Sequence, residues 1–162
     1  MDNNSIEEKN LNGYSIGLNL YKWIINNITL GTNILELGSG AGSYELSKHY
    51  NVTSIEQNRE YVNKYPGIDY IWAPIDSVSN WYEESCLSLL PDQYSLLVLD
   101  GPGGYRRDGI IPYLNSFNFN VPVIVDDVHR SPEANFAFYL ADRYKKKMHY
   151  IQEHDKSAVI LY

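Results

Sequence analysis

The stretch Asn33-Ile-Leu-Glu-Leu-Gly-Ser-Gly-Ala-Gly42 contains the signal that decides the fold of this chain. An apolar run of strand length leads into three glycines with the spacing Gly38-x-Gly40-x-Gly42. Glycine allows the chain to turn without a Cβ clash, and it allows backbone N–H groups to approach a ligand closely. The stretch therefore predicts a strand over 33–37, a glycine-rich turn and a helix over 43–50, with a nucleotide-like ligand at the turn.

The glycines alone leave three interpretations of this turn open: an ordinary strand–helix connection, a dinucleotide site, or a site for another nucleotide-like cofactor. The dinucleotide pattern requires a third glycine at position 43, where this chain has Ser43, and Glu36 stands two residues before the first glycine. Glu56 ends a second apolar run 18 positions after Gly38, where a carboxylate can accept hydrogen bonds from both hydroxyls of a ribose. Asp76 follows the third predicted strand, where it either faces an adenine ring or serves as a turn or helix-cap residue.

Apolar strand-like runs alternate with helix-like stretches along the chain, and this alternation predicts an α/β fold with a mostly parallel sheet. The predicted strands cover residues 33–37, 52–56, 69–73, 94–100, 121–126, 148–154 and 157–162. The predicted helices cover residues 14–29, 43–50, 78–90 and 131–147, with a further helix between the second and third strands. Ser131 is the expected N-cap of the last helix. The last two strands are too close together for a helical crossover, so they must form an antiparallel hairpin at one edge.

Three carboxylates follow neighbouring strands of the predicted sheet, with Asp100 at the end of one strand and Asp126 and Asp127 at the end of the next. Because the carboxyl ends of parallel strands open onto one edge of a sheet, the three should converge there, beside the ligand. Two interpretations stay open. The cluster holds a divalent cation such as Mg²⁺ or Mn²⁺, or it is neutralised by arginines, for which the candidates are Arg106, Arg107 and Arg130.

Candidate catalytic residues surround the same acids. Asp100 is expected where a substrate and a cofactor would meet. His129 is a candidate base because its ordinary pKa lies near neutrality, with a structural role at the sheet edge as the alternative. Arg106 lies in the loop after Asp100, where it either closes over a substrate or is a solvated charge.

With these residues in place, the chain resembles the class I S-adenosylmethionine-dependent methyltransferases from about residue 14 to residue 162. The resemblance rests on Glu-Leu-Gly-Ser-Gly-Ala-Gly, the acid that ends the second strand, the acid after the third, and the paired strands at the C-terminal end. It implies a Rossmann-like, doubly wound sheet of seven strands with an antiparallel C-terminal edge strand. It also implies that S-adenosylmethionine binds to Glu36, Gly38, Ser39, Gly40, Gly42, Glu56, Gln57, Asp76 and Asp100.

The segments Leu99-Asp-Gly-Pro-Gly-Gly-Tyr105 and Val125-Asp-Asp-Val-His-Arg130 carry a second resemblance. The Asp-Gly-Pro-x-Gly-Tyr turn is similar to that of glucuronoxylan methyltransferase-like and related O-methyltransferases, and the acids resemble the metal ligands of catechol-type O-methyltransferases. Those catechol-type enzymes carry Asp-Asn where this chain has Asp126-Asp127, and a lysine base where this chain has Gly103. The resemblance implies methyl transfer to a hydroxyl of a sugar-like or small polar substrate, with metal assistance left open.

Length, composition and charge limit the domain organisation, the substrate class and the location that we expect for this chain. The 162 residues suit a single domain over 1–162, with residues 1–13 as a flexible N-terminal segment. The net charge of −7 supplies no basic surface for sequence-independent nucleic-acid binding, so we expect a small-molecule substrate. The single cysteine excludes an internal disulfide framework. No apolar run approaches the ~20 residues that span a bilayer, and the N-terminus is polar, so we expect a cytoplasmic protein that does not bind membranes.

The sequence therefore predicts an S-adenosylmethionine-dependent methyltransferase that acts on a sugar or another hydroxylated metabolite, with an oligomeric state left open. A non-catalytic S-adenosylmethionine-binding protein, or a support subunit of a methyltransferase complex, is the alternative that the compact length and the missing lysine favour. A nucleotide-dependent oxidoreductase is disfavoured by Ser43. Nucleic-acid methylation is disfavoured because Asp100-Gly-Pro-Gly stands where an Asn/Asp-Pro-Pro-Tyr signature would be expected.

Overall fold

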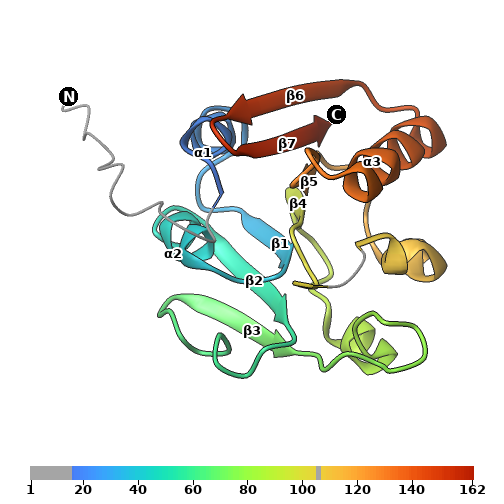
Figure 1. Cartoon of the computed structure of the whole chain (residues 1–162). Helices are drawn as coiled ribbons and strands as arrows, with labels where there is room; N and C mark the ends of the chain where they lie inside the picture. Colours follow the sequence, from blue (N-terminus) through green and yellow to red (C-terminus); the bar gives the residue numbers. More distant parts are fainter. Residues whose placement is uncertain (1–15, 105–106) are drawn as a thin grey trace.

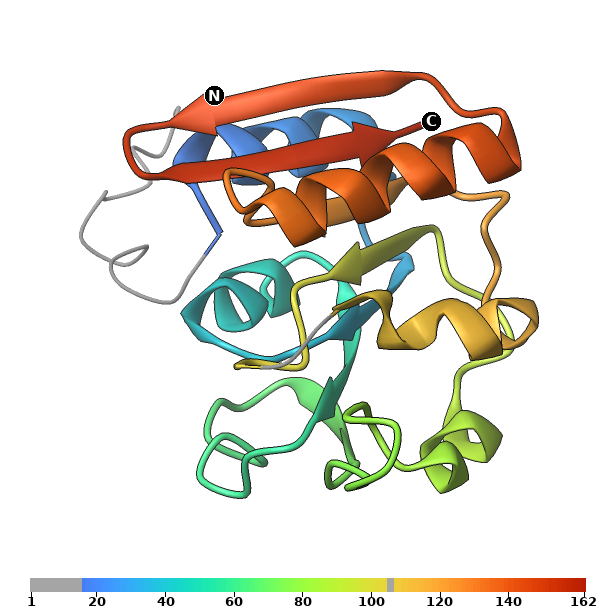
Figure 2. The same cartoon turned by 45° about the vertical axis from the view of Figure 1, so that its right-hand side comes forward.

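The computed structural model describes residues 16–104 and 107–162, which form one seven-stranded sheet with helices against both faces (Figures 1 and 2). The segment 1–13 and the candidate Arg106 lie outside the described residues. The strands are β1 (Asn33–Leu37), β2 (Asn51–Glu56), β3 (Ile68–Trp72), β4 (Leu96–Leu99), β5 (Val123–Asp126), β6 (Met148–Glu153) and β7 (Lys156–Leu161). Their order across the sheet is β3-β2-β1-β4-β5-β7-β6. The predicted fold class, a doubly wound and mostly parallel sheet, is confirmed.

The strand order reverses between β1 and β4, at the middle of the sheet. Leu37, the last residue of β1, pairs with Ile55 of β2 on one side and with Leu99 of β4 on the other. β3 lies parallel to β2 and β5 lies parallel to β4, so five parallel strands end at the same edge. A crevice forms at such a reversal outside the carboxyl ends of the strands, and ligands bind there in open α/β sheets.

The last two strands form the predicted antiparallel hairpin. β7 is inserted between β5 and β6 and runs antiparallel to both. Asp126 at the end of β5 pairs with Ala158 near the start of β7. An antiparallel strand begins where its partner ends, so the β6–β7 turn lies at the same edge as the carboxyl ends of the parallel strands.

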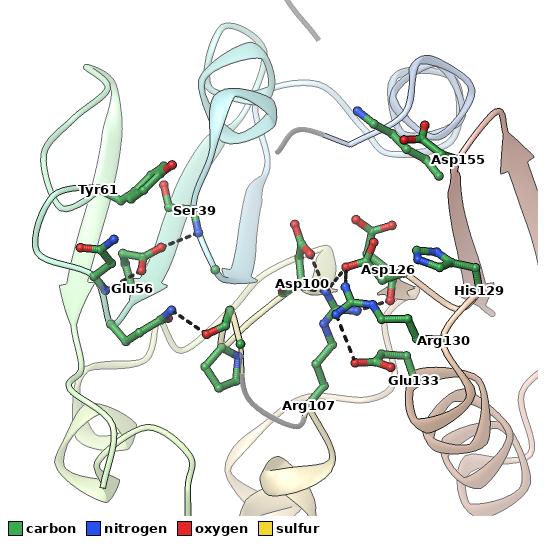
Figure 3. Close-up of a pocket in the computed structure, with 18 residues that line it drawn as sticks. Ser39, Glu56, Tyr61, Asp100, Arg107, Asp126, His129, Arg130, Glu133 and Asp155 are labelled. Atoms are coloured by element: carbon green, nitrogen blue, oxygen red, sulfur yellow. Dashed lines mark hydrogen bonds and ion pairs between the residues drawn. The ribbon is translucent and has the colours of Figure 1, made fainter. Parts of the chain in front are cut away.

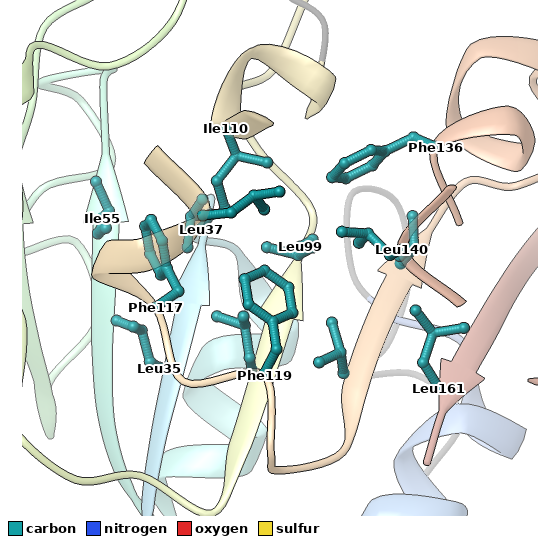
Figure 4. Close-up of a cluster of buried hydrophobic side chains, with 14 of the residues drawn as sticks. Leu35, Leu37, Ile55, Leu99, Ile110, Phe117, Phe119, Phe136, Leu140 and Leu161 are labelled. Carbon is teal, nitrogen blue, oxygen red and sulfur yellow. The ribbon is translucent and has the colours of Figure 1, made fainter. Parts of the chain in front are cut away.

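Alternate residues of the strands supply the two faces of the sheet, as the pleat requires. In β4, Leu96 and Val98 belong to the apolar cluster of α1 (Leu18–Asn27) and α2 (Ala41–Ser47), which are the helices predicted over 14–29 and 43–50. Leu97 and Leu99 face the opposite layer, made of α3 (Ser131–Tyr144) and the 3₁₀ helices η2 (Glu84–Leu89) and η3 (Arg107–Ser116). Figure 4 shows the buried side chains of this second layer, and packing on both faces fixes the ends of the strands.

The two helices predicted on either side of β3 are wrong. Residues 57–67 form turns, and residues 78–90 contain turns, η2 and an isolated β-bridge from Tyr82 to Ile75. The carboxylate of Asp76 accepts hydrogen bonds from the amides of Val78 at 3.1 Å and Ser79 at 2.7 Å. Short polar side chains that bond to the local backbone in this way compete with helix formation.

The ends of α3 differ from the predicted ones. Arg130 occupies the N-cap position without a side-chain cap hydrogen bond, and Ser131 is the first helical residue, so the predicted serine cap is wrong. The helix ends at Tyr144, three residues earlier than predicted, because Lys145 adopts a left-handed conformation with φ of 53°. Among the described residues, no helix combines the length and the apolar character that crossing a membrane requires.

Candidate functional site

A cleft of about 590 Å³ lies at the edge where the parallel strands end (Figure 3). This volume is within the range of small-molecule and cofactor sites, which is roughly 300–1,000 Å³. Its walls come from the ends of β1, β2, β4 and β5, from the first turns of η3 and α3, and from the β6–β7 turn. The lining residues are Gly38, Ser39, Glu56, Gln57, Asn58, Tyr61, Asp100, Pro102, Gly103, Gly104, Arg107, Asp126, Asp127, His129, Arg130, Glu133, Asp155 and Lys156.

The glycine turn is shaped as much by chain packing as by the cleft. Gly38 has φ of 89°, and a Cβ there would lie 3.0 Å from the backbone nitrogen of Gly101 in the loop after β4. A Cβ at Gly42 would lie 3.0 Å from the side chain of Ile16. Gly38 and Ser39 line the cleft, whereas Gly40 and Gly42 are not among its lining residues. Two of the three glycines are therefore required by neighbouring segments of the chain itself.

A hydrogen-bonded pair lies behind the turn. The hydroxyl of Ser43 donates to Oε1 of Glu36 at 2.5 Å and accepts from the amide of Gly40 at 2.9 Å. Glu36 is 5% exposed, and burial raises its pKa to about 8, while the hydrogen bond from Ser43 lowers it and the charge of Glu56 raises it. Glu36 does not line the cleft itself, but it borders a small pocket together with Gly40, Gly42, Ser43 and Asp100, and Asp100 lines both.

Glu56, at the end of β2, lies in the wall of the cleft and is buried. Its Oε2 accepts from the amide of Ser39 at 2.9 Å, and its Oε1 accepts from the amide of Asn58 at 2.7 Å. The side-chain amide of Gln57 hydrogen-bonds the backbone of Gly103 across the cleft. The structure thus brings Gly38, Ser39, Glu56 and Gln57 together, as predicted from the resemblance.

Asp76 is placed differently from these residues. It is not among the residues that line the cleft, and its carboxylate is held in the turn by the amides of Val78 and Ser79. The hydrogen bonds from Ser79 lower its pKa. Of the two roles that the sequence left open, the geometry favours the turn residue over the adenine contact.

The three acids predicted to converge do so. Asp100, Asp126 and Asp127 each present a carboxylate oxygen within 4.8 Å of those of the other two. Asp126 is buried and the other two are partly exposed to the cleft. The convergence follows from the parallel order of β4 and β5, whose ends lie side by side.

Arg107 lies in the middle of this cluster, with only 5% of its side chain exposed. Its Nη2 donates to Oδ1 of Asp100 at 2.7 Å, to the carbonyl oxygen of Asp100 at 3.0 Å and to Oδ2 of Asp127 at 2.8 Å. Its Nη1 donates to the carbonyl oxygen of Asp126. Arg130 forms a second ion pair with Oδ2 of Asp127. The arginine-paired interpretation of the cluster is therefore the one that these contacts support.

The protonation of the cluster follows from its burial and its neighbours. Burial raises the pKa of Asp100 to about 8, the charge of Asp126 raises it further, and Arg107 acts in the opposite direction. Burial also raises the pKa of Asp126, against the lowering effect of Arg107, Lys156 and Arg130.

A divalent cation does not fit the cluster as it stands. Mg²⁺ and Mn²⁺ need several oxygen ligands with free lone pairs facing one point. Here Arg107 occupies that point and takes one carboxylate oxygen from Asp100 and one from Asp127. A guanidinium cannot lose its proton, so it would repel a cation placed beside it.

Of the two remaining catalytic candidates, the structure describes His129 alone. His129 lines the cleft, and its Nδ1 lies 3.2 Å from the hydroxyl of Ser157. Arg106, the other candidate, is outside the residues that the structure describes.

Several residues that line the cleft were not predicted as site residues from the sequence. Asp155 and Lys156 reach it from the β6–β7 turn, and the predicted hairpin was the signal that could have located them. Tyr61 comes from the turns after β2, for which the sequence carries no clear signal. Glu133, in the first turn of α3, is 6% exposed, and its Oε2 has no hydrogen-bond partner within the part of the chain that the structure describes. A buried carboxylate oxygen that accepts no hydrogen bond is uncommon, and it marks a place where a ligand that donates a hydrogen bond could lie.

Comparison with known proteins identifies the fold. No protein-family model matches the sequence, and no curated protein matches it. A Staphylococcus aureus protein proposed as a caffeoyl-CoA O-methyltransferase matches with a TM-score of 0.61 at 16% identity, over 88% of this chain and 80% of its own. The precorrin 8w decarboxylase of Methanobacterium thermoautotrophicum gives 0.62 at 14%, over 96% and 95%. The precorrin-6y C5,15-methyltransferase of Geobacter metallireducens gives 0.62 at 13%, over 89% and 87%.

These identities are low enough that the likeness shows the fold alone. The fold is that of the class I methyltransferases, as the resemblance of the sequence implied. One fold can carry different activities, and the names of these proteins include both methyltransferases and a decarboxylase. The function therefore has to be argued from the cleft and its residues.

Proposed function

We propose that the chain is an S-adenosylmethionine-dependent methyltransferase that transfers a methyl group to a hydroxyl of a small polar acceptor, such as a sugar. The observation that carries the proposal is the position of Ser39 and Glu56 in a cleft at the reversal of strand order. Nucleotide-like ligands bind at this point of open α/β sheets, with an acid at the end of the second strand on the ribose.

The cofactor end of the cleft has the hydrogen-bonding capacity that a ribose needs. Each carboxylate oxygen of Glu56 accepts one backbone hydrogen bond, from Ser39 or from Asn58, and keeps a further lone pair. The two remaining lone pairs can accept from the two hydroxyls of one ribose ring. Glu56 would therefore hold the ribose without giving up the contacts that orient its own side chain.

The charge of the cleft suits a cationic cofactor. Its walls carry six carboxylates, in Glu56, Asp100, Asp126, Asp127, Glu133 and Asp155, against three cationic side chains, in Arg107, Arg130 and Lys156. A cleft with an excess of one sign raises the local concentration of ligands of the opposite sign. Bound S-adenosylmethionine supplies a methyl group on a positively charged sulfur, which is the electrophile that the transfer requires.

Asp100 and His129 are the residues that we propose for proton transfer from the acceptor. A general base works best when its pKa lies near the operating pH, and the raised pKa of Asp100, about 8, meets this condition. His129 lies in the same cleft, and an imidazole nitrogen can accept a proton from a hydroxyl. The acceptor hydroxyl would lose its proton to one of these two groups as the new carbon–oxygen bond forms.

Isothermal calorimetry with S-adenosylmethionine tests the proposal first. We expect saturable binding by the intact chain, and binding about tenfold or more weaker in Glu56→Gln, because a charged hydrogen-bond acceptor contributes roughly 1.5–3 kcal/mol. Asp142→Asn, an exposed acid near the end of α3, is the matched control and should bind like the parent. Absence of binding at about 1 mM cofactor would contradict the proposal.

A cofactor-binding protein without activity of its own is the second candidate. It is favoured by Gly103, which lines the cleft where the catechol-type enzymes carry a lysine base. A methyl-transfer assay with labelled cofactor across a panel of sugars and other hydroxylated metabolites separates the two candidates. Turnover of any acceptor, lost in Asp100→Asn, supports the enzyme, whereas cofactor binding without turnover on any of them supports the second candidate.

A further inference from the structure

The centre of the carboxylate cluster is filled by an arginine of the chain itself. Arg107, the first residue of η3, places its guanidinium against all three residues of the cluster at once. Two of the four acceptors are carboxylate oxygens and two are backbone carbonyl oxygens. These oxygens, from the ends of β4 and β5, are of the kind that a divalent cation would use.

We infer that Arg107 is a built-in counter-ion that replaces a divalent metal among Asp100, Asp126 and Asp127, so that the cleft binds and positions its ligands without a metal. The first half of this inference concerns the cluster alone. The second half, that transfer needs no metal, rests on the proposed function. The sequence left two interpretations of the cluster open, a divalent metal or a neutralising arginine, and we infer the arginine.

The burial of Arg107 argues that it does not move aside for an ion. Its side chain is 5% exposed, and its residue as a whole is 6% exposed. A guanidinium stays charged at any pH that proteins meet, so withdrawing it would take a charged donor away from the carboxylate of Asp100 and from two backbone carbonyl oxygens. A metal ion could enter the cluster only by breaking these contacts, and its binding would first have to offset their loss.

The backbone of the cluster is arranged around the same guanidinium. Asp127 adopts φ of 59°, a left-handed conformation that is uncommon for a residue other than glycine. In this conformation the carbonyl oxygen of Asp126 and the carboxylate of Asp127 both accept hydrogen bonds from Arg107. Backbone conformations of this kind persist where the surrounding contacts determine them.

Arg130 has a different position and serves as an internal comparison. It is 47% exposed and contacts only Asp127 among the three acids, with Glu133 at 3.9 Å on its other side (Figure 3). Removing Arg130 would leave Arg107 in the centre of the cluster. Removing Arg107 would leave three carboxylates within 4.8 Å of one another, with the exposed Arg130 paired to only one of them.

Binding of Mn²⁺ alone, followed by electron paramagnetic resonance and by thermal unfolding, tests the inference. We expect no saturable binding by the parent chain up to about 1 mM Mn²⁺, the weak end of protein cation sites. Arg107→Met, which keeps an unbranched, flexible side chain without the guanidinium and its charge, should unfold at a lower temperature and gain one Mn²⁺ site. Its unfolding temperature should then rise with Mn²⁺ concentration. Arg130→Met should gain no site.

Each outcome decides the inference. Saturable binding of Mn²⁺ by the parent chain would overturn it, whether or not any variant folds. A folded Arg107→Met that binds no Mn²⁺ would also overturn it, because the uncovered carboxylates would then not form a cation site. If Arg107→Met is unfolded without metal, refolding in the presence of Mn²⁺, followed by circular dichroism, replaces the titration, and failure to refold counts against the inference.

The test separates this inference from the proposed function. A parent chain that binds no S-adenosylmethionine would contradict the methyltransferase and leave the metal result unaffected. A parent chain that binds both the cofactor and Mn²⁺ would contradict only the inference. Cofactor binding without any metal binding supports both.

Discussion

The hydroxyl of Ser43 donates a 2.5 Å hydrogen bond to the buried carboxylate of Glu36, and the same hydroxyl accepts from the amide of Gly40. A serine in the first turn of α2 thus connects the end of β1 to the glycine turn. Glu36 stands in the segment that decides the fold, Ser43 follows it directly, and neither lines the cleft. The two hydrogen bonds hold the glycine turn against the end of β1.

The pH dependence of stability should report on Glu36. Burial raises its pKa in the folded protein from 4.5 to about 8, so folding favours the protonated form. Its contribution to stability is complete below about pH 4.5 and is lost as the pH rises through 8. Glu36→Gln, which keeps an acceptor for Ser43 and cannot ionise, should therefore lose less stability between pH 5 and pH 9. Urea unfolding at the two pH values measures this, and equal losses in both proteins would contradict the assignment.

Ser43→Ala should destabilise the protein. It leaves the amide of Gly40 and the carboxyl group of Glu36 buried without their partner, which typically costs about 1–3 kcal/mol. Ser47→Ala is a matched control, because Ser47 donates only to the carbonyl of Tyr44 within the same helix. We expect a loss within about 0.5 kcal/mol for the control, measured by urea unfolding. Equal losses in the two variants would show that the link to Glu36 contributes nothing.

Gly101→Ala should destabilise the protein through overpacking. A Cβ at Gly101 would lie 2.7 Å from the amide nitrogen of Gly38 and would meet the hydroxyl of Tyr82. Overpacking of this kind costs typically about 1–3 kcal/mol, and it would also displace the glycine turn from β4. Gly103→Ala is the control, because its Cβ would meet only the end of the Gln57 side chain at 3.3 Å. Thermal unfolding should show a clear decrease for Gly101→Ala alone.

The role of Asp76 can be decided by comparing two substitutions. Asp76→Asn keeps an oxygen for the amides of Val78 and Ser79, whereas Asp76→Ala removes it. We expect Asp76→Ala to lose about 1 kcal/mol of stability and Asp76→Asn to lose little. Calorimetry should show cofactor affinity within about twofold of the parent for Asp76→Asn. A tenfold weaker affinity in that variant would instead support the adenine contact.

The parts of the fold that the sequence predicted are those decided by local pattern. The apolar runs of β1, β4 and β5 and the short connection between β6 and β7 carried clear periodicity and spacing. The convergence of Asp100 with Asp126 and Asp127 was also predictable, because parallel strands end at one edge. Glu56 was found for the same reason, from its place at the end of β2.

The irregular segments were not predictable in this way. The stretches around β3 were expected to be helical, yet the side chain of Asp76 bonds to its own turn and ends the helix pattern. Helix η3 was not expected, and it begins at the residue that carries the cleft's central guanidinium. Local polar contacts and the packing of distant segments decided these stretches, and neither leaves a periodic signal.

The sequence by itself determined the α/β class, the glycine turn and the edge at which the acids meet, because each depends on residues close together in the chain or on strand direction. Only the tertiary structure decided what lies between those acids. The choice between a metal and an arginine depends on where the side chain of Arg107 reaches after β4 and β5 have paired, and on its burial there. Contacts of this kind join residues 7 to 20 positions apart through a folded loop, so spacing alone cannot specify them.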